Sequence, residues 1–269
     1  MSLRRILVST FPHRRLYLSY FPNSVDKQLL RLRPIALGAA ALALSLSAAV
    51  GFVHLDSNIF REKESTVVEP ATSFEFPATL RIPSRGALPE FTLLGVGVGV
   101  VTFFKIKVYS AAFYADLSNP SLKIPSSASP EEKLAYIVRN TACVLRIVPT
   151  RNTTYSHIRD GFIRTLQARH WAASEAGELS SDEQLNLQAP IAQLRSALSN
   201  MPFKKGTPLD LVLTHPDPKQ PRALIFWELG AVQNDWVARE LILSFFDGRS
   251  NKSNSAALQQ SVFNRVAQL

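Results

Sequence analysis

The chain has 269 residues, of which 46% are hydrophobic and 19% charged, an ordinary composition for a globular protein. Its net charge of +9 is concentrated at the N-terminus, because residues 1–33 contain seven basic residues and one acid and leave only +3 for the rest. A nucleic-acid-binding protein would carry its basic residues on the folded domain, so we exclude that class. The chain has a single cysteine, Cys143, which excludes an intrachain disulfide.

Residues 1–33 predict a mitochondrial targeting segment. The first 25 residues contain no Asp or Glu and are rich in arginine and serine, with leucines and aromatic residues between them. This is the composition of a transit peptide, because a secretory signal places its apolar core directly after the basic residues. We therefore predict a mitochondrial protein.

Residues 34–53, PIALGAAALALSLSAAVGFV, contain no charged residue and predict one transmembrane helix. At about 1.5 Å per residue the segment spans about 30 Å, the thickness of the hydrocarbon core of a bilayer. A long secretory apolar region or a buried helix is the alternative. Arg31 and Arg33 precede the segment, so the positive-inside rule places the N-terminus in the matrix. The partner membrane is then the inner mitochondrial membrane, with the domain in the intermembrane space.

The remainder predicts a linker at 54–72 and one α+β domain at 73–269. Strands concentrate early, helices follow in the middle, and a hairpin and two helices close the chain, an order that disfavours alternating βαβ units. Apolar alternation and β-branched residues predict strands at 73–82, at 91–116 as two long strands with a bend near 104–107, and at 141–149, 208–214 and 222–227. Start signals and helical periodicity predict helices at 130–140, 153–171, 181–200 (with Pro190 kinking or splitting it), 234–247 and 255–269.

The run GVGVGV at 95–100 is superficially similar to a dinucleotide-binding loop. A phosphate loop needs a helix directly after the glycines, so that backbone N–H groups face the phosphates. Here the next residues, VVTFFKIKVY, predict more strand, so we reject a nucleotide site. Glycines at alternate positions of a strand instead clear one face for a ligand, a packed aromatic ring or a bend.

Polar residues give weaker signals. The five histidines show no i, i+4 pairing with a nearby acid, so we predict no metal site. Four arginines gather around the strand–helix junction at 141–164, and an arginine at a strand end can hold a carboxylate ligand in its planar fork. Solvated or capping charges are the alternative for each of them. These arginines are Arg146, Arg151, Arg159 and Arg164.

Two segments, LLGVGVGVVTFFKIKVYSAAFY (93–114) and RIVPTRNTTYSHIRDGFIRTLQ (146–167), together resemble the chalcone isomerase-like family. More narrowly, they resemble its fungal mitochondrial branch, the "altered inheritance of mitochondria" proteins. The resemblance covers residues 73–267. It implies an open-faced β-sandwich, in which helices cover a curved antiparallel sheet and a ligand cleft lies between the two.

The resemblance also implies a set of cleft residues. In the family's isomerases, an arginine at the end of the glycine-rich strand holds the reacting oxyanion, and the match puts Gly99 at that position. Tyr155 matches a cleft tyrosine, and Ser244 matches a serine or threonine that contacts substrate. Tyr109 and Phe162 stand where the plant enzymes have threonine and asparagine. These changes imply that flavonoid cyclisation is lost and that the pocket is more apolar.

Non-catalytic relatives bind fatty acids, and the fungal branch is linked to haem. The resemblance therefore implies a membrane-anchored, non-catalytic binder of an apolar or amphipathic ligand such as a fatty acid or haem. For haem, His157 and Tyr155 are the candidate axial ligands. Family ligands use the missing arginine, so binding would require a replacement such as Arg146 from a neighbouring strand.

Two other functions stay open at this stage. One is an isomerase with an unknown substrate, with Tyr155 and Ser244 as hydrogen-bond donors. The other is an interaction module whose cleft is filled by its own side chains, for which Phe103, Phe113 and Phe162 are the candidates.

Overall fold

A computed structural model describes residues 65–84, 88–101, 106–179, 187–247 and 253–269. The chain divides into two units, 1–56 and 57–269, and all described residues belong to the second. The expected targeting segment and the expected membrane span at 34–53 lie outside the described residues, so both stay predictions. Within the described residues, no helix combines the length and the apolar character needed to cross a bilayer.

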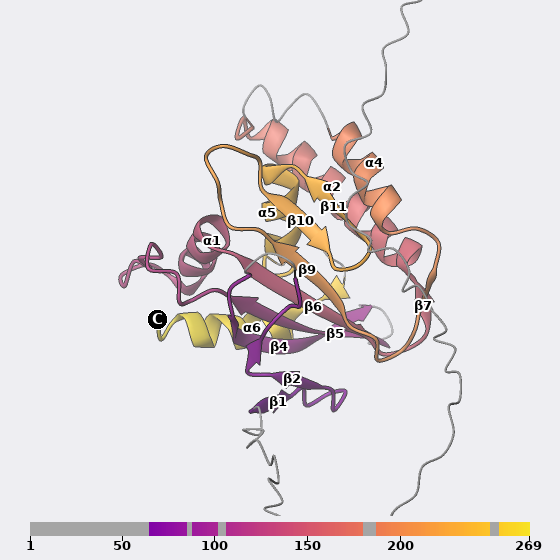
Figure 1. The fold of residues 1–269 in the computed structure, drawn as a ribbon, viewed down its shortest axis with the longest axis horizontal. Helices are drawn as coiled ribbons and strands as arrows, with labels where there is room; N and C mark the ends of the chain where they lie inside the picture. The colour runs from indigo at the N-terminus through magenta and orange to yellow at the C-terminus, as the bar shows by residue number, and fades with distance from the viewer. Residues whose placement is uncertain (1–64, 85–87, 102–105, 180–186, 248–252) are drawn as a thin grey trace, which may run out of the picture. The chain divides into compact units, whose positions relative to one another are not determined.

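One curled antiparallel sheet organises the fold, with helices packed on one of its faces (Figure 1). Its path is β11(Gly230–Gln233), β10(Ala223–Phe226), β9(Leu209–Leu213), β6(Cys143–Pro149), β5(Ile106–Ala115), β4(Phe91–Val101) and β12(Ser253–Asn254), and β3(Thr79–Leu80) also pairs with β4. Two short pairs lie outside it: β1(Thr66–Val68) with β2(Glu75–Pro77), and β7(Thr153–Thr154) with β8(Pro202–Phe203).

The helices begin where the sequence supplies caps. Ser129 and Glu132 form a capping box at the start of the first helix, and the side chains of Thr154 and Asn234 cap two others. The described helices are α1(Pro130–Asn140), α2(Tyr155–Glu175), α4(Gln188–Ala197), α5(Asp235–Leu243) and α6(Ala256–Val266).

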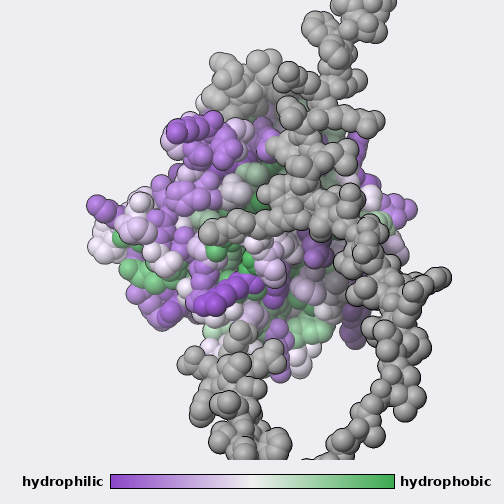
Figure 2. All heavy atoms as spheres, in the orientation of Figure 1, coloured by the Kyte–Doolittle hydropathy of each residue, from purple (hydrophilic) through white to green (hydrophobic). Residues whose placement is uncertain are grey.

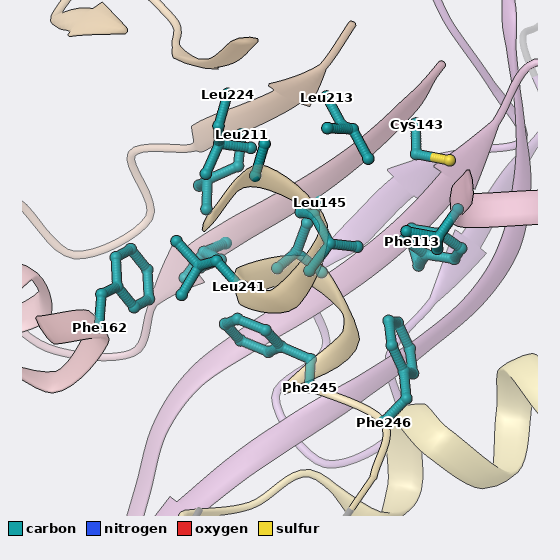
Figure 3. Packing of buried hydrophobic residues seen from close by; sticks show 14 of the residues in the cluster. Phe113, Cys143, Leu145, Phe162, Leu211, Leu213, Leu224, Leu241, Phe245 and Phe246 are labelled. Atoms are coloured by element: carbon teal, nitrogen blue, oxygen red, sulfur yellow. The ribbon is translucent and has the colours of Figure 1, made fainter. Parts of the chain in front are cut away.

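Side-chain alternation gives the sheet two apolar faces. One face, which we call the helix face, packs against all five of these helices, and Phe113, Leu145 and Leu211 lie at its centre (Figure 3). The opposite face, which we call the second face, carries Tyr114 and Val144 and is covered by the N-terminal segment 74–82. Figure 2 shows a mostly hydrophilic outer surface in this view, with a smaller apolar area near the centre.

Two β-bulges decide which side chains reach which face. Leu93 pairs with Tyr114 and Gly95 with Phe113, so Leu94 is an extra residue in β4. Farther along, Gly99 pairs with Tyr109 and Val100 with Lys107, so Val108 is an extra residue in β5. An extra residue reverses the alternation beyond it. The first bulge places Gly95, Gly97 and Gly99 on the helix face, and the second directs Lys107 to the second face.

The α+β organisation is as the sequence predicts, and the antiparallel sheet covered by helices is as the resemblance implies. The expected strands at 91–116, 141–149, 208–214 and 222–227 correspond to β4, β5, β6, β9 and β10, although residues 102–105 at the expected bend lie outside the description. A helix forms in each of the five expected ranges, although α2 continues to Glu175, past the expected end at 171. The described part of the 181–200 range is helical at 188–197.

Pro190 lies in the first turn of α4, where backbone N–H groups have no partner within the helix. Residues 180–186 lie outside the description, so a break in the helix expected at 181–200 stays a prediction. Two details differ from expectation. Strand β11 was not expected, because only Val232 of its four residues is buried and no alternation marks it. Strand β1 lies inside the range expected as linker, 54–72, because Thr66–Val68 pairs with β2.

Candidate functional site

The glycines of β4 let a helix approach the sheet backbone. A Cβ atom on Gly97 would lie 2.1 Å from the backbone nitrogen of Leu258, and one on Gly95 would lie 2.7 Å from that of Val262. Both neighbours belong to α6, so any side chain at these positions would push this helix away. The close approach of a helix is not among the three uses of alternate glycines named above.

At Gly99 the neighbour is an aromatic ring. Gly99 and Tyr109 are direct antiparallel partners, and a Cβ atom on Gly99 would lie 2.2 Å from Tyr109 Cζ. The Tyr109 hydroxyl is 3.0 Å from Ser255 Oγ, and its ring meets Phe245 edge-on with centroids 6.2 Å apart. The phenol of Tyr109 therefore fills the space that, by the resemblance, the side chain of an arginine at position 99 would occupy.

Next to this ring is a cluster of phenylalanines. Phe162, on α2, is 7% exposed, and its ring contacts those of Phe226 and Phe245. Figure 3 shows Phe162 and Phe245 in the same buried cluster. Phe113 packs edge-on against Phe246 with ring centroids 5.0 Å apart. Two of the three phenylalanines that the interaction-module alternative names, Phe113 and Phe162, are thus buried in the helix-face core. Phe103 lies outside the described residues.

Ser244 does not offer its hydroxyl to this cluster. It is 2% exposed and ends α5, where its Oγ donates a hydrogen bond of 2.7 Å to the carbonyl oxygen of Leu241. This bond satisfies the buried hydroxyl inside its own helix. A role for Ser244 as a donor to a ligand would require breaking it.

Tyr155 and His157 lie at the first turn of α2. The Tyr155 ring stacks on Phe203 with centroids 4.5 Å apart, and burial, with a smaller effect from Glu228, raises the pKa of its hydroxyl. His157 is exposed, and its backbone N–H donates to Thr154 Oγ1. Haem does not fit this arrangement, because the exposed His157 lies outside the aromatic cluster and Tyr155 is stacked on a neighbouring ring. Among the described residues, no group of three or more His, Cys, Asp or Glu is placed to hold a metal ion.

Arg146 lies on the second face. Its Nε and Nη2 donate hydrogen bonds of 2.7 and 2.8 Å to the two carboxylate oxygens of Asp210, its antiparallel partner on β9. Burial lowers the pKa of Arg146, but the hydrogen bonds and charge of Asp210 raise it more. The sheet itself separates this guanidinium from Gly99 and Tyr109. The structure therefore does not bring Arg146 to the cleft of the helix face.

Beside the Arg146–Asp210 ion pair lies Tyr114, a residue that the sequence did not single out. It is 0% exposed, and within the described part of the chain its hydroxyl has no hydrogen-bond partner. Burial raises the pKa of Tyr114, the charge of Arg146 lowers it and that of Asp210 raises it. No sequence signal marks this residue, because the position of β6 next to β5 decides its neighbours.

The other candidate arginines have separate environments. Arg159 pairs with Asp160 and donates a hydrogen bond of 3.3 Å to the carbonyl oxygen of Leu198. Arg151 lies at the rim of a hollow of about 390 Å³ that the sequence did not predict. Its lining residues are Thr72, Phe74, Lys107, Thr150, Arg151 and Lys205.

Comparisons with known proteins agree with this fold. A family model described as "Chalcone isomerase like" matches residues 127–263. "Altered inheritance of mitochondria protein 18, mitochondrial" of Eremothecium gossypii is 26% identical over 86% of this chain and 84% of that protein. Its namesake in Vanderwaltozyma polyspora is 25% identical over 72% of this chain and 70% of that protein. The crystal structure of an Arabidopsis thaliana fatty-acid binding protein superposes with a TM-score of 0.51 at 19% identity, covering 76% of this chain and 98% of that one, which is a likeness of fold.

Proposed function

Because the chain belongs to the chalcone isomerase-like family, we propose that it is a non-catalytic, membrane-anchored mitochondrial member that binds a fatty acid at its helix face. The observation that carries this proposal is the contact between Gly99 and Tyr109. Where the family's isomerases present a cation, this chain presents a neutral phenol.

The loss of the cation argues against isomerase chemistry. Stabilising a developing oxyanion requires a positive charge or strong donors held in place beforehand, and removing one such donor costs about 3 kcal/mol of transition-state stabilisation. Arg146 is engaged by Asp210 on the other side of the sheet. The hydroxyl of Ser244 is engaged by its own helix.

The same region suits an amphipathic ligand. The hydroxyls of Tyr109 and Ser255 form a polar pair at the edge of a cluster containing Phe162 and Phe245. In our proposal the fatty-acid carboxylate accepts hydrogen bonds from these two hydroxyls. The acyl chain then lies along the rings of Phe162 and Phe245, while the Tyr109 hydroxyl stays at the carboxylate. The Arabidopsis structural neighbour, whose title names fatty acids as its ligand, supports this choice by its fold.

The test is a binding measurement on the full chain in a neutral detergent, with displacement of a fluorescent fatty acid as the readout. Tyr109→Phe keeps the ring but removes the donor, so we expect about five- to tenfold weaker binding, the value of one net hydrogen bond. Tyr136→Phe on α1 is the matched control and should bind as the natural chain does. Equal affinities of all three chains would refute the proposed carboxylate contact.

One observation favours a second candidate function, an interaction module without a ligand. Phe113 and Phe162 are buried in ring contacts, as expected of a cleft filled by its own side chains. Organic extraction of the chain purified from its host separates the two candidates. An acyl chain recovered in stoichiometric amount supports the binder. If no acyl chain is recovered and added fatty acid does not bind, the interaction module is the better account.

The membrane assignment is a proposal of its own. Relatives named as mitochondrial support the compartment, and the uncharged segment 34–53 supports a single span of the inner membrane. With the N-terminus in the matrix, the domain lies in the intermembrane space. Protease added to mitochondria should then leave a C-terminal tag intact until the outer membrane is ruptured, and a tag still protected after rupture would place the domain in the matrix.

A further inference from the structure

The hollow on the second face is lined by three basic side chains and by no acidic one. Lys107, Arg151 and Lys205 surround a space of about 390 Å³, with Phe74 as an apolar wall. Two threonines, Thr72 and Thr150, complete the lining. Three like charges around one space repel each other, so this arrangement favours an anion between them.

Three separate segments of the chain bring the cations together. Lys107 reaches this side because Val108 is the extra residue of the bulge in β5. Arg151 follows the end of β6, where the hydroxyl of the preceding residue, Thr150, donates a hydrogen bond of 2.8 Å to the carbonyl oxygen of Lys107.

Lys205 belongs to the turn before β9, and backbone contacts tie this turn to the end of β6. Its backbone N–H donates to Asn152 Oδ1 at 2.9 Å, and the N–H of Gly206 donates to the carbonyl oxygen of Pro149 at 3.0 Å. Gly206 has φ +78°, a left-handed conformation that favours glycine. These backbone hydrogen bonds therefore hold Lys205 at the edge of the hollow.

Carboxylates do not neutralise these cations. Within the described part of the chain, none of Lys107, Arg151 and Lys205 forms an ion pair. The Lys107 ammonium donates one hydrogen bond, to the carbonyl oxygen of Ala71, and so keeps two further protons. A nearby carboxylate, that of Glu69, is buried and accepts hydrogen bonds from Ala71 N and Thr72 Oγ1, so it is engaged within its own turn.

We propose that this hollow binds a phosphate group carried by a small molecule or by a lipid. A guanidinium binds two phosphate oxygens at once, and two ammonium groups add point charges, which together suit a dianionic phosphate monoester. Phe74 can contact the apolar or planar part of the molecule next to the phosphate. The site lies on the opposite face of the sheet from Gly99, so it does not depend on the proposed fatty-acid site.

The experiment is calorimetric titration of the full chain in neutral detergent with two probes. Glycerol 3-phosphate presents the phosphate alone, and dihexanoyl phosphatidic acid presents the same headgroup with short acyl chains. We expect at least one probe to bind, about tenfold more weakly in Arg151→Gln and in Lys205→Gln, and more weakly at higher salt. Both side chains are exposed, so neither substitution disturbs the core.

Lys123→Gln and Lys219→Gln are the matched controls, because both lysines are exposed and follow the far ends of β5 and β9. Binding of both probes would assign the site to soluble phosphate monoesters, and binding of the phosphatidic acid alone would assign it to a lipid headgroup. Absence of binding by both probes overturns the proposal. It is equally overturned if the affinity survives both pocket variants or falls as much in the controls.

Discussion

The Tyr109 ring lies so close to Gly99 that a single methyl group on residue 99 would stand 2.2 Å from Tyr109 Cζ. No L-residue other than glycine can occupy position 99 while Tyr109 keeps its place. The glycine at 99 and the tyrosine at 109 therefore depend on each other. A change at either position alone leaves an empty space or a clash.

The first prediction concerns restoring the cation. Gly99→Arg alone should lower the free energy of unfolding by about 1–3 kcal/mol, because the new side chain displaces the Tyr109 ring. Combining it with Tyr109→Thr should recover most of that loss, because threonine vacates the space. Thermal unfolding of the two variants and the natural chain measures this recovery. A single Gly99→Arg variant as stable as the natural chain would show that the ring moves without cost.

The same pair tests for residual isomerase activity. The natural chain and Gly99→Arg should give no flavanone from a chalcone above the uncatalysed rate, because neither presents a placed cation next to a free cleft. Activity that appears only in the double variant would mean that the rest of the catalytic site is intact. Turnover by the natural chain would reject our assignment of a non-catalytic protein.

The second prediction concerns the contact between α6 and β4. A Cβ atom on Gly97 would lie 2.1 Å from backbone nitrogen of Leu258, which cannot rotate away as a side chain can. Gly97→Ala should therefore cost about 1–3 kcal/mol in the free energy of unfolding. Gly161→Ala on α2 is the control, because open space surrounds that position, and alanine there should stabilise the helix by about 0.5–1 kcal/mol. Urea unfolding of both variants checks the opposite signs.

Local patterns predicted much of this architecture. The alternating apolar residues around Phe113 and the helix-start signal at Pro130 depend only on neighbouring residues, so they can be found in the sequence. The stripe of glycines also predicted that one face of its strand is cleared. Which neighbour uses the cleared face could not be predicted, because α6 lies more than 150 residues later in the chain than Gly95.

The candidate site was harder to predict than the fold. The resemblance implied one cleft for Gly99, Tyr109 and Phe162, and the structure brings Tyr109 and Phe162 together around Phe245. Arg146 was expected as a possible replacement for the missing cation, but its face depends on strand register. Its partner, Asp210, is 64 residues away along the chain, and no residue near Arg146 indicates that pairing. The cationic hollow likewise depends on a bulge that no residue type marks.

The third prediction concerns the Arg146–Asp210 pair. Asp210→Asn removes the charge that balances a largely buried guanidinium, so it should cost about 3 kcal/mol in the free energy of unfolding. Replacing both residues, as Arg146→Met with Asp210→Leu, should stay within about 1 kcal/mol of the natural chain, because no charge is left unpaired. Chemical denaturation of the three chains compares the two costs. A double variant less stable than Asp210→Asn would contradict this account.

The same double variant tests whether Arg146 serves the ligand. Because the sheet separates Arg146 from Tyr109, the variant should bind a fluorescent fatty acid with unchanged affinity. Loss of binding in a variant that remains folded would show that the guanidinium reaches the ligand after all. The proposed position of the carboxylate, at Tyr109 and Ser255, would then be wrong.

The fourth prediction concerns the only thiol. Cys143 lies on the helix face and is 0% exposed. Burial raises its pKa to about 12, although the charge of Arg222 acts in the opposite direction. The thiol stays neutral in the folded chain, whereas in the unfolded chain it ionises above its ordinary pKa of 9.0. Its contribution to stability is therefore complete below pH 9 and is lost as the pH rises from there towards 12.

Two measurements follow from this shift. Iodoacetamide should not modify the folded chain at pH 8, and it should modify the urea-unfolded chain readily, because the thiolate is the nucleophile. Above pH 9, the free energy of unfolding of the natural chain should fall more steeply than that of Cys143→Ala, by up to about 1.4 kcal/mol for each pH unit. Parallel stability curves for the two chains, or rapid alkylation of the folded one, would mean that the strand around Cys143 opens to water and that the helix-face core is less closed than its packing indicates.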